Sequence, residues 1–214
     1  MAITTALFET QYFPPVQYFS LLIQADEVMI EAKEHYQKRS YRNRCHLAGP
    51  NGPIRLSVPL LRGKNEQMPI SEVQVAYRRP WYGEHWHSIR TAYGKAPFFE
   101  FYAEELRPLL YARPARLFDL NTELLRKLME LLQIDRPLHF TENYSAAGES
   151  GVIDCREAAH PKHPARAFRA AAYPQVFEDR HGFLPNLSIL DLLFCTGPQA
   201  ALLLQQFAEQ NPLV

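Results

Sequence analysis

One short run of the sequence gathers the side chains best suited to bind an anion. Residues 31 to 46 carry five fixed positive charges and two carboxylates. If residues 41 to 47 form a strand, Arg42 and Arg44 project from the same face, two residues apart. Paired guanidinium groups at that spacing can hold a phosphate or a carboxylate through forked hydrogen bonds. We therefore predict that Arg42 and Arg44 bind an anionic small-molecule substrate.

The opposite face of the same predicted strand places Asn43 between Tyr41 and Cys45, beside the core. A buried amide needs hydrogen-bond partners, so Asn43 is expected to fix a loop backbone or to contact a ligand. Tyr41 joins it as a candidate substrate contact. The alternative is an exposed sheet edge protected by basic residues. Asn43 is hard to explain as edge protection and favours the binding site.

Candidate proton carriers lie just before these cations. Positive neighbours keep Glu31 and Glu34 ionised, so either could act as a base or orient His35. Glu34 and His35 are both candidate catalytic residues. Lys38 would neutralise charge that develops during transfer, and Glu31 is a candidate substrate contact. The alternative for both carboxylates is a salt bridge to Lys33 or Lys38.

A second group of candidates lies in "WYGEHWHSIRTAYGKAPFF". His85 is the candidate catalytic residue, and Trp86, Tyr93 and Lys95 are candidate substrate contacts, since aromatic rings near a helix end can stack on a sugar or a base. His85 also shares a helical face with Trp81. A satisfied core histidine is therefore the default interpretation, and a ligand-contacting one is the alternative.

Metal and nucleophile chemistry receive little support from the sequence. Cys155, His160 and His163 depart from the usual structural-zinc spacing, so no metal site is predicted. Cys45 and Cys195 are interpreted as small buried hydrophobic residues. There is no glycine-rich phosphate loop and no nucleophile-elbow pentapeptide. The cofactor stays undetermined.

The overall charge of the chain argues against nucleic acid as a partner. The 214 residues contain 23 Lys and Arg and 23 Asp and Glu, so binding to nucleic acid through bulk charge is not expected. RNA binding through "KRSYRNR" is the weakest hypothesis for the same reason. No window is long and apolar enough for a membrane span, and the amino terminus lacks a signal-peptide pattern. We expect a cytoplasmic protein.

The elements that must position these residues follow from the hydrophobic pattern. "AITTALFE", "VQYFSLLIQAD" and "EVMIE" predict a strand, a helix and a strand, which is a βαβ opening with parallel pairing. Alternating residues on both sides of Asn51–Gly52 predict a hairpin, and "SEVQVAY" predicts a further strand. The fold class is α/β, with a mixed sheet, a central hairpin and helices packed around it.

The second half of the chain is predicted to be helical. Helices are expected from Trp81, over "FEFYAEELRPLLYA" and over "LFDLNTELLRKLMELLQ", and "LHFTENY" is a possible strand. We predict an α/β domain over residues 1–144 and a long irregular loop or arm over 145–185. Residues 186–214 are expected to form a helical segment that packs on the same domain. The long carboxy-terminal segment that follows the α/β domain is compatible with a homodimer.

Three stretches carry a resemblance to a known family. "QYFPPVQYFSLLIQADEVMIE", "YQKRSYRNRCHLAGPNGPIRLSVPL" and "EHWHSIRTAYGKAPFFE" resemble the WbqC-like proteins in the same order and spacing, from about Glu9 to Tyr144. The resemblance implies a role in making or decorating an amino-sugar-containing glycan of bacterial surface polysaccharides such as O-antigen. The positions that match the family pattern are Lys38, Asn43, Arg44, His85, Trp86, Tyr93 and Pro97.

The chain also departs from the pattern of that family. It has Glu9–Thr10 where the family usually has Gln-Pro, and Gln17–Tyr18 where the family has Gly-Tyr. The paired acidic residues after the second strand become Ala32–Lys33. If those acidic residues are catalytic in the family, the chemistry of this branch has moved or changed.

Two functions of different classes remain open from the sequence. The first is a group transferase that acts on an activated anionic substrate, such as a nucleotide sugar or an acyl or aminoacyl donor. The second is a non-catalytic accessory protein that docks a partner enzyme or a glycan. The first predicts a concave pocket in which Arg44, Asn43 and His85 converge, and the second predicts that these residues lie on a flat surface.

Overall fold

Two buried strands and the helix between them form the centre of the structure. The computed structural model describes residues 3–63, 65–145, 151–161 and 168–213. Strand β1 (Thr5–Glu9), helix α1 (Val16–Leu22) and strand β2 (Glu27–Glu31) follow one another, and all seven residues of α1 are buried. The two strands pair in parallel. The predicted βαβ opening is therefore confirmed.

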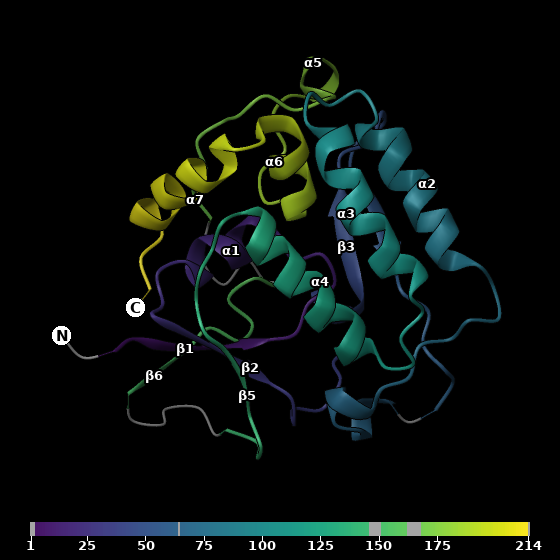
Figure 1. Cartoon of the computed structure of the whole chain (residues 1–214), viewed down its shortest axis with the longest axis vertical. Helices are drawn as coiled ribbons and strands as arrows, with labels where there is room; N and C mark the ends of the chain where they lie inside the picture. Colours follow the sequence, from purple (N-terminus) through teal and green to yellow (C-terminus); the bar gives the residue numbers. More distant parts are fainter. Residues whose placement is uncertain (1–2, 64, 146–150, 162–167, 214) are drawn as a thin grey trace.

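The main sheet among the described residues is parallel throughout. Its order is β5-β2-β1-β6, with β5 at Leu138–Phe140 and β6 at Val152–Asp154 (Figure 1). The chain moves outward from β1 to β2 to β5 and then returns to the other side of β1. The strand order thus reverses between β1 and β6. At such a switch point, the loops after the carboxyl ends of neighbouring strands diverge and leave room for a ligand.

The predicted hairpin is present, but it forms a separate two-stranded sheet. Strands β3 (Arg44–Leu47) and β4 (Ile54–Ser57) pair in antiparallel fashion. The strand predicted over residues 41 to 47 is wrong at its start, because Tyr41–Asn43 forms the 3-10 helix η1. The Ser40 hydroxyl caps this turn by accepting a hydrogen bond from the Arg42 N–H.

The strand predicted over "SEVQVAY" is also replaced by other structure. Ile70–Glu72 forms the 3-10 helix η3 after Pro69, and Asn65–Gln67 forms η2. Only isolated bridges, Leu60 with Val75 and Gln74 with Arg116, extend the pairing there. The alternating pattern indicated which side chains are buried, and the chain buries them without a continuous strand.

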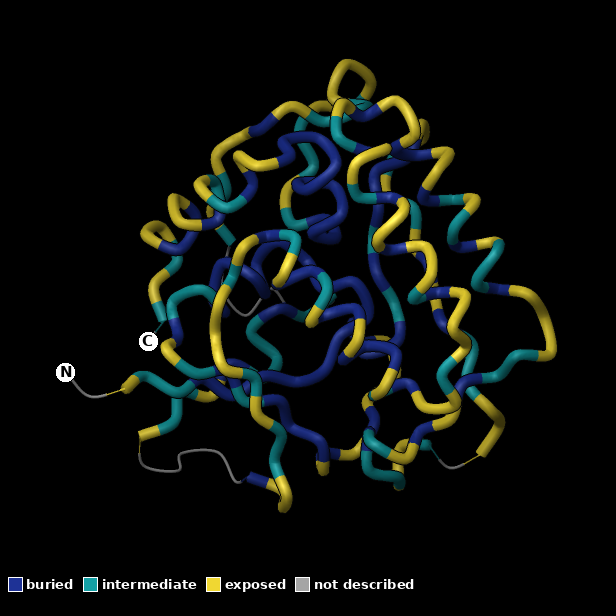
Figure 2. The backbone as a smooth tube through the Cα atoms, in the orientation of Figure 1, coloured by how far each residue is buried: buried dark blue, intermediate teal, exposed yellow. Residues whose placement is uncertain are grey.

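Three amphipathic helices cover the hairpin side of the molecule. They are α2 (Trp81–Tyr93), α3 (Phe99–Tyr111) and α4 (Leu117–Leu131), and each buries one face (Figures 1 and 2). The predicted helices are confirmed, and so is the α/β fold class. No helix in the described ranges is long and apolar enough to cross a membrane.

The carboxy-terminal helices complete the core. Helix α6 (Ile189–Thr196) is buried along its whole length and contacts α1, α2, α3 and α7 (Gln199–Gln210). Ser188 caps α6 by accepting a hydrogen bond from the Leu190 N–H. Burial on all sides explains why α6 is apolar except at Asp191 and Thr196.

Residues 145–185, predicted to be an irregular loop or arm, contain β6 and the short helix α5 (Glu178–His181). The later part of this segment is fastened to α6. The Tyr173 hydroxyl and the Gln175 amide donate to Asp191 Oδ2 at 2.8 and 2.7 Å. Burial raises the pKa of Asp191 to about 6, although these hydrogen bonds oppose the rise. The part of the segment around Tyr173 and Gln175 is thus fixed by a buried polar contact.

Gly197 offers a test of how tightly α6 is packed. It ends α6 with a φ of +56°, and a Cβ added there would overlap the Phe98 ring. Gly182 has a φ of +74° but open space around it. Both Gly→Ala variants should lose about 1–3 kcal/mol to backbone strain. Gly197→Ala should lose about 1–3 kcal/mol more from overpacking. Urea denaturation measures both, and equal losses would contradict the packing of α6 against Phe98.

Candidate functional site

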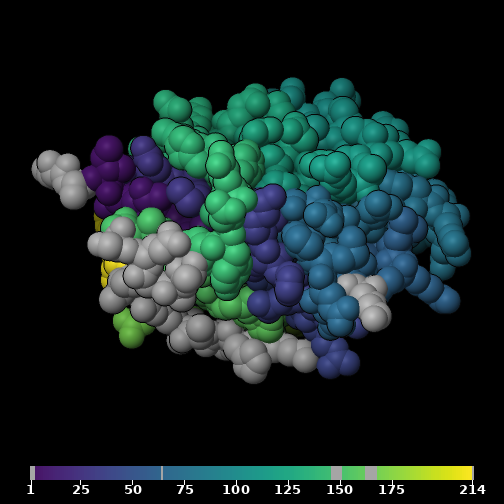
Figure 3. Space-filling view, turned by 90° about the horizontal axis from the view of Figure 1, so that it is seen from below, coloured from purple at the N-terminus to yellow at the C-terminus, as the bar shows by residue number. Residues whose placement is uncertain are grey.

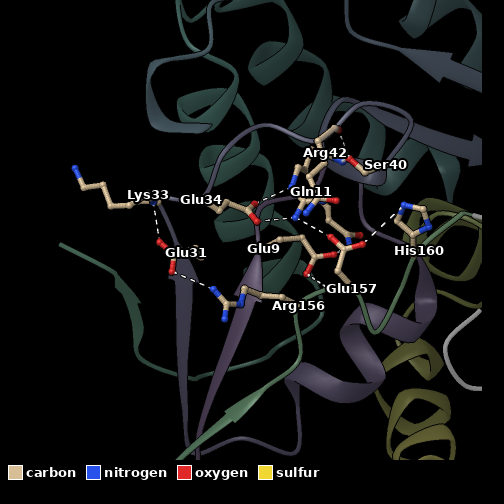
Figure 4. Close-up of polar contacts among 12 residues, drawn as sticks. Glu9, Gln11, Glu31, Lys33, Glu34, Ser40, Arg42, Arg156, Glu157 and His160 are labelled. Atoms are coloured by element: carbon tan, nitrogen blue, oxygen red, sulfur yellow. Dashed lines mark hydrogen bonds and ion pairs between the residues drawn. The ribbon is translucent and has the colours of Figure 1, made fainter. Parts of the chain in front are cut away.

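Polar side chains meet where the parallel strands end. Glu9 and Glu31 are the last residues of β1 and β2, and they lie opposite one another in the register. Figure 4 shows both carboxylates at the carboxyl edge of the sheet, with Arg42, Arg156 and Glu157 around them. These side chains come from the ends of β1 and β2, from the turn that holds Arg42 and from the loop after β6. The parallel sheet brings them together because all its carboxyl ends share one edge.

Glu31 ties the surrounding loops together. Its Oε1 accepts hydrogen bonds from the Lys33 N–H at 2.8 Å and the Thr141 hydroxyl at 2.6 Å. Its Oε2 accepts from the Ser145 N–H at 2.9 Å and from Arg156 Nη1 at 3.3 Å. The carboxylate is fully buried. Its contacts join the segments that follow β2, β5 and β6, so its observed role is to position those loops.

Glu9 lies in a different environment. It is 2% exposed and accepts hydrogen bonds from Gln11 Nε2 at 2.6 Å and from the Glu157 N–H at 3.2 Å. Burial raises the pKa of Glu9 to about 7, Arg42 opposes the rise, and Glu34 adds to it. This carboxyl therefore changes its charge near neutral pH. A group with such a pKa can take up or release a proton during a reaction.

Arg42 is the centre of the charged cluster. Its side chain is 1% exposed, and Nε and Nη2 bind Glu34 at 2.7 and 2.6 Å. Nη2 also binds Glu157 at 2.9 Å. Burial lowers the pKa of Arg42, but the bonds and charges of Glu34, Glu9 and Glu157 outweigh burial and raise it. We call Arg42, Glu34, Glu157 and Glu9 the Arg42 cluster.

The contacts of Arg42 correct the expectation that it binds an external anion with Arg44. Its guanidinium is occupied by the carboxylates of the chain itself. The turn directs it inward: Asn121 Nδ2 donates to the Arg42 carbonyl at 2.8 Å, and the Tyr12 N–H donates to the Tyr41 carbonyl at 2.9 Å. A strand would have placed both guanidinium groups on one face, and the 3-10 turn separates them.

The loops that carry the site have strained backbone. Phe13, in the loop after β1, has a φ of 43°, and Glu157, in the loop after β6, has a φ of 65°. Residues other than glycine rarely adopt this conformation, which costs about 1–3 kcal/mol for each residue. At Glu157 this backbone conformation lets the side chain bind Arg42 while the backbone N–H donates a hydrogen bond to Glu9. Strain of this kind gathers at functional sites.

Gln11 has an unused hydrogen-bond acceptor beside Glu9. Its Nε2 donates to Glu9 Oε1 at 2.6 Å and to the Ala159 carbonyl at 3.2 Å. Its Oε1 is buried and no donor within the described residues reaches it. An unsatisfied buried acceptor costs about 1–3 kcal/mol. The amide oxygen is therefore placed to accept a hydrogen bond from a ligand or a water molecule.

A groove of about 710 Å³ runs along the segment that follows β2. We call it the tyrosine groove; its lining residues are Lys33, Glu34, His35, Tyr36, Gln37, Lys38, Glu66 and Tyr144. In Figure 3, the segment after β5 (green) lies beside the segment after β2 (violet) on this face. The groove reaches Glu34 and thus the Arg42 cluster. It also brings together three predicted catalytic residues, Glu34, His35 and Lys38.

The predicted residues around Asn43 have structural contacts. Asn43 accepts a hydrogen bond from the Tyr36 hydroxyl at 3.0 Å and donates to the Val58 carbonyl at 2.9 Å. It fixes the loop after β4, which is one of the two roles expected for it. Tyr41 is buried, with its hydroxyl 3.4 Å from His46 Nδ1. Neither side chain lines the tyrosine groove.

The predicted residues of α2 lie elsewhere. His85 is buried 2.9 Å from the Tyr12 hydroxyl and lines another groove, of about 280 Å³, beside Trp81. Burial lowers the pKa of His85 to about 4, so its ring is neutral near pH 7. This placement agrees with a core histidine. The structure thus places His85 apart from the groove that holds the other predicted catalytic residues.

The other candidate contacts of α2 also differ in their surroundings. Trp86 stacks on Phe99, Tyr93 is buried and accepts a hydrogen bond from the Ala48 N–H, and Lys95 is exposed. Among the residues described, no group of three His, Cys, Asp or Glu is arranged to hold a metal ion. His163, considered above for zinc, lies outside those residues.

Comparison with known proteins assigns the family. The model of the WbqC-like protein family matches residues 10–163, which is most of the chain. The chain belongs to the WbqC-like protein family. A curated relative, "Uncharacterized protein Rv1507c" of Mycobacterium tuberculosis (strain ATCC 25618 / H37Rv), is 28% identical over 220 residues, covering 91% of this chain and 94% of the relative. No solved structure matches the chain.

Within this WbqC-like chain, sequence reasoning overlooked Glu9, Gln11, Arg156 and Glu157. Glu9 was noted only as a departure from the family pattern. A carboxylate at the end of a buried strand was the available signal, because such a position lies at the ligand-binding edge of a parallel sheet. Gln11 and Glu157 gave no local signal. Glu157 approaches Glu9 from 148 positions away in the chain. Gln11 is only two residues from Glu9, but its amide is also held by the Ala159 carbonyl, 148 positions from Gln11.

The pKa of Glu9 predicts how Glu9→Gln changes stability with pH. A carboxyl that titrates near 7 when folded and near 4.5 when unfolded stabilises the protein below pH 4.5. That stability is lost as the pH rises to about 7. Relative to Glu9→Gln, the wild type should therefore lose up to about 3 kcal/mol of unfolding free energy between pH 4 and pH 8.

Urea denaturation across that pH range measures the difference. The exposed Glu142 provides a matched control, since Glu142→Gln should follow the wild-type pH dependence. Parallel curves for the wild type and Glu9→Gln would contradict the raised pKa.

Proposed function

We propose that the chain is a group transferase that joins an amine or a hydroxyl of an amino-sugar acceptor to an activated, anionic donor. The observation that carries this proposal is the Glu9–Gln11 pair at the switch point of the sheet. Burial raises the pKa of Glu9 to about 7, and the Gln11 carbonyl oxygen beside it has no donor among the described residues. A proton acceptor and an unsatisfied hydrogen-bond acceptor together suit a substrate that carries N–H or O–H groups.

Glu9 would act as the general base. A base works best when its pKa is close to the working pH, because it is then largely ionised and still binds a proton well. An ordinary glutamate, with a pKa near 4.3, is a poor acceptor for the proton of an amine or a hydroxyl. Burial in the Arg42 cluster supplies the needed shift. Arg42 in turn holds Glu34 and Glu157 in ion pairs close to Glu9.

The proposed step is a nucleophilic transfer. One hydrogen of the acceptor amine or hydroxyl is donated to Gln11 Oε1 or to Glu9. The acceptor nitrogen or oxygen attacks the electrophilic carbon of the donor and forms a new bond to it. The bond from that carbon to its leaving group breaks, and the electron pair departs with the anionic leaving group. Glu9 accepts the proton that the nucleophile loses.

The tyrosine groove is the proposed binding site for the substrates. Tyr144 provides exposed aromatic surface suited to a sugar ring, and the buried Tyr36 forms part of the groove wall. Lys33 and Lys38 are exposed cations suited to an anionic donor. Lys38 is paired with Glu66 at 2.7 Å, but both side chains are exposed, so this contact is weak and exchangeable. His35 also lines the groove and remains a candidate proton carrier.

The proposal that the transfer belongs to surface-polysaccharide synthesis is based on the family to which the chain belongs. The residues that resemble the WbqC-like pattern, and the family match over residues 10–163, support a glycan-related role. The docking alternative requires no small-molecule ligand. It would be favoured if no sugar or activated donor stabilised the protein.

A thermal-shift screen against nucleotide sugars, acyl-coenzyme A, nucleoside triphosphates and amino sugars tests the proposal. A ligand at about a hundredfold its dissociation constant should add about 2.7 kcal/mol of stability. With the donor and acceptor so identified, Glu9→Gln should reduce kcat by about 10²- to 10⁴-fold and remove the rise in rate near pH 7. Glu142→Gln should leave the rate unchanged.

Stabilisation by none of these compounds would overturn the transferase assignment. An unchanged pH profile in Glu9→Gln would remove Glu9 as the base, even if a ligand binds. The two results separate failure of substrate binding from failure of the assigned chemistry.

A further inference from the structure

The β3–β4 hairpin presents a basic face that the Arg42 cluster does not use. The register pairs His46 with Arg55 and Arg44 with Ser57, so these four side chains project from one face. The other face carries Cys45 and its apolar neighbours and packs into the core. We call the outward side chains of Arg44, His46 and Arg55 the basic ribbon face.

The positive charges of this face repel one another. Burial lowers the pKa of Arg44, and Arg55 and Arg39 lower it further. Burial also lowers the pKa of His46, with further contributions from Arg44 and Arg55. The described residues form ten ion pairs, and none of them includes Arg39, Arg44 or Arg55. The face therefore lacks the counter-charge that Arg42 has.

Arg44 also has a hydrogen-bond donor without a partner. Its Nε is buried, and no acceptor among the residues described lies within reach. A buried donor left unpaired is unfavourable, so its presence beside unneutralised arginines indicates a missing acceptor. An oxyanion would supply both the acceptor atoms and the negative charge.

The basic ribbon face lies next to the tyrosine groove. Tyr36 lines the groove, and its hydroxyl is close enough to Arg44 for each to shift the pKa of the other. Arg39 follows Lys38, another lining residue, and contributes to the same positive field. A ligand in the groove could therefore extend its anionic end over Tyr36 to the arginines.

We propose that Arg44 and Arg55, with Arg39 nearby, form a subsite for a phosphate or diphosphate group. Forked guanidinium donors match phosphate oxygens, and the shared charge of a diphosphate would relieve the repulsion between the arginines. The inference rests on the proposed function in one respect: the phosphate or diphosphate is taken to be part of the activated donor. Binding of the anion itself does not depend on Glu9.

Isothermal titration calorimetry with sodium pyrophosphate at low salt tests the subsite. Arg55→Gln and Arg44→Gln should each weaken pyrophosphate binding by about tenfold to a hundredfold, because each removes a charge-assisted hydrogen-bond donor. Arg55 is exposed, so its replacement should leave the fold intact. Arg126→Gln, which removes an exposed arginine paired with Glu123 on α4, is the matched control and should bind as the wild type does.

Glu9→Gln separates this inference from the proposed function. It should keep pyrophosphate affinity while losing transfer. The His46 ring, observed by NMR and assigned with His46→Gln, should shift on pyrophosphate addition in the wild type and not in Arg55→Gln.

A second ligand identifies the source of the phosphate. A nucleoside diphosphate that binds at least about tenfold tighter than pyrophosphate would indicate a nucleotide-activated donor, and equal affinity would indicate a phosphate group from another source. Two results would overturn the subsite. One is wild-type protein that does not bind pyrophosphate. The other is affinity that changes by less than about twofold in both arginine variants, as edge protection by basic side chains predicts.

Discussion

The buried ion pair between Arg42 and Glu34 is the interaction on which the arrangement of the site depends. It joins the segment after β2 to the η1 turn, and the additional bond to Glu157 brings in the loop after β6. Removing one partner of a buried ion pair typically costs about 3–5 kcal/mol, because the remaining charge stays unpaired. The pair contributes little net stability over an apolar substitute. Its importance is that it holds these three segments together through one side chain.

Two carboxylates in the same register show how environment divides their roles. Glu9 and Glu31 end adjacent strands and are both buried. Glu31 accepts four hydrogen bonds, including one from Arg156, and joins three loops. Glu9 accepts two bonds from uncharged groups, and burial raises its pKa to about 7. The number and charge of the donors separate a structural carboxylate from one suited to proton transfer.

Two arginines separated by one residue have opposite surroundings. Arg42 points inward and is neutralised by carboxylates, whereas Arg44 begins β3 and faces other cations. Asn43, between them, fixes the backbone through Tyr36 and Val58. The short segment therefore separates a buried charged cluster from a positive surface.

The sequence by itself determined the βαβ opening, the hairpin, the main helices and the identity of the family, because hydrophobic periodicity and local motifs are properties of neighbouring residues. It also predicted a site around residues 31 to 46. Only the tertiary structure decided that Arg42 turns inward, since the 3-10 turn is fixed by the distant Asn121 and Tyr12. Only the tertiary structure, likewise, places Glu157 beside Glu9, which is 148 positions away in the chain. Burial and charge neighbours set a pKa, and both are created by contacts between distant segments.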